Sequence, residues 1–224
     1  MLSRIAGTLL LLACLLQPAV GSAVILGQID DFQDNTTQGW AIGAFVPPTD
    51  PAQPVNVPDG GPAGAGDHFM RLTAEGGIGD GSKLTVFNRT QWTGNYLAAG
   101  VNAITMSVKN LGATDLSLRL YVADDTFSNP PNLPPNAALS TKPVLLRAGS
   151  GWTFVVFPIA PANLTALAGS AQTALTNAAD LRLFHNPAAS FPGPAVVASL
   201  GVDDIHAVRG VPLPSLPLLL LFDD

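Results

Sequence analysis

The stretch LSLRLYV, residues 116–122, decides the fold class that this sequence predicts. Apolar residues occupy every second position, and Ser117, Arg119 and Tyr121 stand between them. Because side chains of a β-strand point alternately to opposite faces, this period of two predicts a half-buried strand. Residues 104–109, ITMSVK, show the same alternation and predict a second strand.

Similar short runs of β-branched and apolar residues recur along the chain, separated by Gly, Pro, Asn and Asp. They predict strands near residues 28–32, 40–46, 68–74, 83–88, 103–110, 117–123, 142–146, 153–159, 181–185 and 196–208. Residues 47–66 and 128–135 are rich in turn residues and predict loops, and residues 160–179 predict one short helix. We therefore expect an all-β fold, a single antiparallel β-sandwich of the jelly-roll, galactose-binding-domain-like kind.

The chain ends predict export. Residues 1–23 carry Arg4, an apolar run too short to span a bilayer, and then small residues, the layout of a secretory signal peptide. The alternative is an N-terminal membrane anchor. The only cysteine, Cys14, lies in this segment, so the mature chain has no disulfide and must bury a core over residues 24–210. We expect a secreted, extracellular protein, or one associated with the cell surface.

The last residues, 211–224, read VPLPSLPLLLLFDD and resemble the bacterial PEP-CTERM sorting tag in its Val-Pro-Leu-Pro variant. That tag continues through a membrane-length helix and ends in an arginine cluster. Here the apolar run stops at Phe222 and two aspartates follow, so we interpret the segment as a degenerate or truncated tag. The alternative is a frayed apolar tail. We expect no stable membrane span in the mature chain.

The charge excludes one class of partner. The chain has 16 acidic and 10 basic residues, a net charge of −6, and no basic stripe. A protein that binds a phosphate backbone needs clustered Lys and Arg to displace counterions, so we expect no nucleic acid.

Two pairs of adjacent acids stand inside apolar runs: IDDF at residues 29–32 and VDDI at residues 202–205. The apolar residues that flank each pair are three positions apart, whereas residues on one face of a strand are two or four apart. One extra residue, a β-bulge, would restore the inward face of the second strand. If the first and last strands also pair, four carboxylates converge.

Such a site suits a hard cation. Freed carbonyls and carboxylates are the ligands that calcium prefers. We therefore predict a structural calcium ion held by Asp30, Asp31, Asp203 and Asp204. The alternative is that these are solvated acids at strand ends.

Several stretches resemble a known group of domains. They are similar to exported jelly-roll domains of PEP-CTERM-type proteins, of the laminin-B-like and carbohydrate-binding-module-like kinds. The stretches are DDF at residues 30–32, NRTQWTGNYLAAGVNAITMSVKNLG at 88–112, GWTFVVFPI at 151–159 and LGVDDIHAV at 200–208. The resemblance covers about residues 28–209. It implies a two-sheet jelly roll, often with a structural calcium joining the first and last strands.

Sugar binding requires aromatic rings that lie against the apolar face of a pyranose, with polar groups beside them. Trp92 and Tyr96 are the candidates, because Gly94 and Asn95 mark a turn between them. The neighbouring polar side chains that would supply hydrogen bonds are those of Asn88, Arg89, Gln91 and Asn95. The alternative is that both rings pack in the core, as we expect for Trp40 and Trp152, which begin predicted strands.

Catalytic motifs are missing from the sequence. Glu75 is the only glutamate and lies in a Gly-rich turn, and no nucleophile elbow, phosphate loop or zinc spacing occurs. We expect a non-catalytic protein that binds extracellular polysaccharide or matrix. The alternatives are a structural surface protein with protein partners and, third, a polysaccharide-cleaving jelly roll.

Overall fold

The computed structural model describes residues 23–42, 54–77, 82–126 and 133–210. One set of strands comprises β1 (Ile29–Asp30), β3 (Val55–Val57), β4 (Phe69–Glu75), β6 (Ala103–Asn110), β10 (Thr153–Pro158) and β13 (Val197–Val208). It forms a six-stranded sheet in the order β10-β6-β13-β4-β3, with β1 also paired to β13. All its strand pairs are antiparallel.

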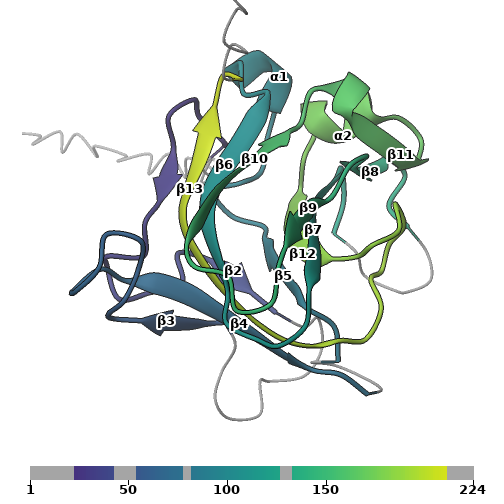
Figure 1. The fold of residues 1–224 in the computed structure, drawn as a ribbon. Helices are drawn as coiled ribbons and strands as arrows, with labels where there is room; N and C mark the ends of the chain where they lie inside the picture. Colours follow the sequence, from purple (N-terminus) through teal and green to yellow (C-terminus); the bar gives the residue numbers. More distant parts are fainter. Residues whose placement is uncertain (1–22, 43–53, 78–81, 127–132, 211–224) are drawn as a thin grey trace, which may run out of the picture.

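A second set comprises β2 (Trp40–Ala41), β5 (Thr85–Asn88), β7 (Leu116–Ala123), β8 (Ala137–Ser140), β9 (Val144–Leu146), β11 (Leu164–Ala168) and β12 (Asp180–His185). It forms a seven-stranded antiparallel sheet in the order β11-β8-β7-β12-β5-β2, with β9 also paired to β7. The two sheets form the layers of a sandwich, with the short helices α1 (Tyr96–Ala99) and α2 (Ala171–Thr176) at one end (Figure 1). The predicted all-β sandwich is confirmed.

The main core lies between the sheets and takes one face of the long strands β4, β6, β7, β12 and β13. Ile104, Met106 and Val108 of β6 are fully buried there, as their alternation predicts. Leu118 and Leu120 of β7 enter the same core from the other sheet.

Strand β7 departs from its prediction because both of its faces are buried. Tyr121, on the face away from the core, lies under Phe191, with the two ring centroids 4.6 Å apart. Arg119 donates hydrogen bonds to the carbonyl oxygens of Asn186 and Pro187, in the same segment as Phe191. A segment distant in sequence therefore covers the face that the alternation assigned to solvent.

The last strand, β13, has the predicted bulge. Asp203 pairs with Ser107 of β6, but His206 pairs with Thr105, so β13 advances by three residues where β6 advances by two. Asp204 has a φ of 50°, a left-handed conformation that non-glycine residues seldom adopt. With the extra residue, Val202 and Ile205 both reach the core. The predicted pairing of β1 with β13 is also confirmed.

Three strands were not predicted. Strand β3 lies within the expected loop at residues 47–66, and β8 was assigned to no element. Strand β11 and a 3-10 turn, η1 (Pro161–Asn163), occupy part of the region expected to be helical, while α2 occupies another part. The alanine-rich sequences of β8 and β11 carry little β-propensity, and their place at one side of the sheet comes from tertiary pairing.

Other predictions fall outside the described residues. These are the signal peptide up to residue 22, residues 43–46 of one expected strand, and the sorting tag at 211–224. Within the described ranges, no helix has both the length and the apolar character needed to cross a membrane.

Candidate functional site

The carboxylate of Asp30 lies in the interior and accepts three hydrogen bonds at one oxygen. The indole Nε1–H groups of Trp40 and Trp92 donate to its Oδ2 over 2.7 Å and 2.6 Å. The side-chain amide of Gln91 donates to the same oxygen over 3.1 Å. Burial raises the pKa of Asp30, while these three hydrogen bonds to the carboxylate act in the opposite direction.

The second aspartate pair lies in the bulge of β13. Only 1% of Asp203 is exposed, and its Oδ1 accepts the backbone N–H of Asp204 over 2.7 Å. Burial raises the pKa of Asp203 to about 8, with smaller contributions in the same direction from the negative charges of Asp204, Asp67 and Asp31, while the hydrogen bond from the Asp204 N–H acts against them. Burial also raises the pKa of Asp204; the positive charge of His206 opposes this effect, and Asp67 and Asp31 add to it.

These contacts divide the predicted calcium ligands. Asp31, Asp203 and Asp204 influence one another electrostatically, whereas the Oδ2 of Asp30 is occupied by its three N–H donors. Asp67, which the sequence reasoning missed, joins the group from the turn before β4, where its Oδ2 accepts the N–H of Ala63. Within the part of the chain that the structure describes, no three acidic, histidine or cysteine side chains are arranged to hold a metal ion.

The predicted aromatic platform is not formed. Trp92 and Tyr96 are both fully buried in the main core, and the Tyr96 hydroxyl donates to the carbonyl oxygen of Trp92. Neither ring presents a face to solvent, because both residues are fully buried. The indole N–H of Trp92 is directed to Asp30. The interpretation of these two rings as a sugar-stacking site is therefore wrong, and the alternative of core packing holds.

The polar residues assigned to that platform have other roles. The Asn95 side chain caps α1 by accepting the N–H of Ala98 over 2.8 Å. Arg89 instead reaches the outer face of the seven-stranded sheet, where its Nη2 lies 3.2 Å from the Oδ2 of Asp180.

That outer face combines rings with charged groups. Arg182 of β12 pairs with Phe87 of β5 on one side and with Tyr121 of β7 on the other. Its guanidinium carbon lies 5.2 Å from the Phe87 ring centroid and 5.8 Å from that of Tyr121. Its Nε and Nη2 donate to the Oδ2 of Asp180 over 2.9 Å and 2.5 Å.

Four buried polar atoms on this face have no hydrogen-bond partner: Thr85 Oγ1, Arg89 Nε, Tyr121 Oη and Asp180 Oδ1. Each unpaired buried group costs about 1–3 kcal/mol, so their accumulation on one surface calls for an explanation. We name this surface the Arg182 face; it consists of Thr85, Phe87, Arg89, Tyr121, Asp180 and Arg182. The signal available in the sequence was the set of polar residues that alternate with the core residues of β7 and β12.

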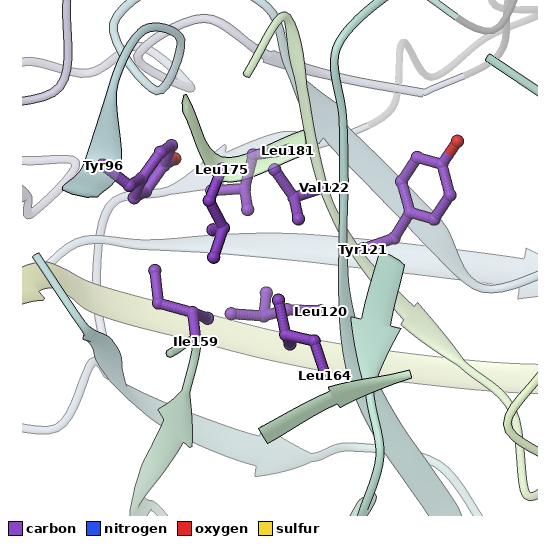
Figure 2. Close-up of a pocket in the computed structure, with 8 residues that line it drawn as sticks. All are labelled: Tyr96, Leu120, Tyr121, Val122, Ile159, Leu164, Leu175 and Leu181. Atoms are coloured by element: carbon purple, nitrogen blue, oxygen red, sulfur yellow. The ribbon is translucent and has the colours of Figure 1, made fainter. Parts of the chain in front are cut away.

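A small cavity lies inside the sandwich, near α2. Its volume is about 10 Å³, and its lining residues are Tyr96, Leu120, Tyr121, Val122, Ile159, Leu164, Leu175 and Leu181. Figure 2 shows the Tyr121 ring turned away from the other side chains of this set. A space of this size accommodates no more than a water molecule, so it is a packing defect and not a sugar site.

Comparison with known proteins supports the fold. No protein-family model matches this chain, and no curated protein sequence matches it. One similar solved structure is the family 11 carbohydrate-binding module from Clostridium thermocellum in complex with a β-1,3-1,4-mixed-linked tetrasaccharide. Its sequence is 12% identical to this chain and the TM-score is 0.51; the match covers 83% of this chain and 96% of that one. An exo-β-agarase is 10% identical with a TM-score of 0.53, over 85% of this chain and 25% of that one. At these identities the likeness establishes a shared jelly-roll sandwich.

The three hydrogen bonds to Asp30 generate a first prediction. Asp30→Asn replaces a charged acceptor by a neutral amide, and charge-assisted hydrogen bonds are about twice as strong as neutral ones. We expect the free energy of unfolding, measured in urea, to fall by about 1–3 kcal/mol. Asp125→Asn, at an exposed position, is the matched control and should change it by less than about 0.5 kcal/mol. Equal effects of the two substitutions would show that Asp30 has no special structural role.

Proposed function

We propose that this protein is an exported, non-catalytic β-sandwich that binds extracellular polysaccharide through the Arg182 face. The observation that carries the proposal is that the open part of this face, Phe87 and Arg89, places an aromatic ring and a guanidinium together beside buried polar atoms that have no partner. Binding sites for small ligands combine apolar and aromatic surface with a few convergent polar groups.

A pyranose unit suits these groups because it has both an apolar C–H face and hydroxyl groups. The Phe87 ring is partly exposed, and a quarter of the Arg89 side chain, 25%, is open to solvent. The Arg89 guanidinium lies 4.2 Å from the Phe87 ring centroid, so its exposed part can donate to a sugar hydroxyl beside that ring.

The face does not suit hydrolysis. Glycosidases use two carboxyl groups at a set separation across the scissile bond. The Arg182 face has a single carboxylate, that of Asp180, and two guanidinium groups occupy one of its oxygens.

The second prediction tests the ligand. Phe87→Ala combined with Arg89→Ala should weaken retardation of the protein in gels that contain mixed-linked β-1,3-1,4-glucan or another polysaccharide that retards wild type. We expect an affinity loss of at least about tenfold, or 1.4 kcal/mol, because a ring contact and a donor are both removed.

Arg147→Ala is the matched control, since Arg147 also pairs with an aspartate, Asp115, but on an exposed surface away from this face. It should leave the retardation unchanged. Failure of the wild-type protein to be retarded by any polysaccharide in a broad panel would refute the proposed function.

We also propose that a calcium ion stabilises the chain ends. The acidic side chains of Asp31, Asp67, Asp203 and Asp204 lie close enough to interact electrostatically, and burial, with a smaller contribution from these neighbours, raises the pKa of Asp203. Carboxylate oxygens are the donors that calcium prefers, so the donor type fits the ion, and binding would draw these side chains together from the arrangement described above. The residues that would hold it are the three predicted acids of this group together with Asp67, whereas Asp30 remains bound to the indoles.

The third prediction concerns this ion. A cation that binds only the native state adds RT ln(1 + [L]/Kd), or about 2.7 kcal/mol at a hundredfold excess over Kd. The Tm should therefore be several degrees higher in calcium than in chelator. Asp203→Asn with Asp204→Asn should remove most of this difference, because neutral amides bind a divalent cation poorly. A wild-type Tm that is identical in calcium and in chelator would contradict the proposal.

A further inference from the structure

Trp152 is the tryptophan that the core does not bury. It stands just before β10 and was expected to cap the core, but the structure places it on the outer face of the six-stranded sheet, partly exposed. Trp40 and Trp92, in contrast, lie in the interior. The expectation that Trp152 caps the core is therefore wrong, and core packing does not explain why this ring is partly exposed.

Three contacts hold the indole against the sheet. Its Nε1–H donates to the carbonyl oxygen of Gly60 over 3.0 Å, and its ring meets the Phe69 ring edge to face at 5.3 Å. Its far end reaches Gly201 on β13, two strands from β10, where a Cβ would lie only 3.0 Å from Trp152 Cη2. The missing side chain at Gly201 thus makes room for the indole across the strands.

The surroundings of the indole add apolar and polar groups. Phe154, two residues along β10 and so on the same side of the strand, is 67% exposed. The ammonium group of Lys109 lies 5.9 Å from the Trp152 ring centroid, and Lys109 pairs with Gly201 in the sheet. We name this group, Phe69, Lys109, Trp152 and Phe154, the Trp152 surface.

We propose that the Trp152 surface is a second carbohydrate-binding site, which takes pyranose units of a polysaccharide on the sheet opposite to the Arg182 face. The indole N–H is already paired, so what Trp152 offers a ligand is the face of its ring. A ring fixed against a sheet loses little conformational freedom on binding, which favours stacking on the apolar face of a sugar.

A sugar fits this surface better than a protein partner does. Stable protein interfaces bury roughly 1,200–2,000 Å² in total and have an apolar centre. Here two aromatic rings are accompanied by Lys109, and Phe69 is itself buried beneath Trp152. The inference rests on the proposed function for its ligand class and adds that one molecule has two sites. Two sites on opposite sheets would let one molecule bridge two polysaccharide chains.

Fluorescence quenching tests the site directly, because Trp152 is the partly exposed member of the chain's 3 tryptophans. Iodide should quench Trp152 preferentially in the wild-type protein. A polysaccharide that retards the protein in gels should suppress this quenching, and the suppression should persist in the Phe87→Ala, Arg89→Ala variant.

A second measurement uses precipitation of the polysaccharide, which requires bridging. Trp152→Ala should abolish precipitation but keep retardation through the Arg182 face. Leu145→Ala, which removes another exposed apolar side chain on the other sheet, should precipitate like wild type. Retardation without any protection of Trp152 would overturn this inference and leave the proposed function standing. Absence of retardation and of protection with every polysaccharide tested would overturn both.

Discussion

The carboxylate of Asp30 is the interaction on which the arrangement of the chain ends depends. It belongs to β1, which pairs with the final strand of the six-stranded sheet, and it binds the indole of Trp40, which begins β2 of the other sheet. It also binds Trp92, ahead of α1. One buried oxygen therefore connects the two sheets and the helical end of the sandwich. A buried charge is tolerated because N–H donors replace the water it has lost.

The bulge in β13 has the complementary role. The extra residue lets Val202 and Ile205 face the core, and it brings Asp203 and Asp204 within electrostatic reach of Asp67. Acidic side chains are thus concentrated where the first and last strands pair. The two proposed binding surfaces lie on the outer faces of different sheets, so ligand binding does not compete with the contacts that close the fold.

The alternation of apolar residues predicted the central strands, and the three-residue spacing around the acids predicted the bulge. What periodicity does not predict is what covers each face, because this depends on residues distant in sequence. The indole of Trp92 donates a hydrogen bond to Asp30, 62 residues away, and that of Trp152 donates to the carbonyl oxygen of Gly60, 92 residues away. The predicted roles of Trp92 and Trp152 are therefore wrong, whereas Trp40 is buried as expected. The Arg182 face was missed for the same reason, since β5, β7 and β12 contribute to it only after they pair.

Hydrogen exchange of the indole N–H groups, followed by ¹H–¹⁵N NMR, tests the central role of Asp30 most directly. The chain has 3 tryptophans and therefore gives three indole signals. Buried hydrogen-bonded groups exchange only through opening of the structure. We expect two slowly exchanging signals, from Trp40 and Trp92, and one faster signal from Trp152, with the slow pair shifted and less protected in Asp30→Asn. Three signals that exchange at similar rates, or a slow pair unaffected by Asp30→Asn, would contradict the account.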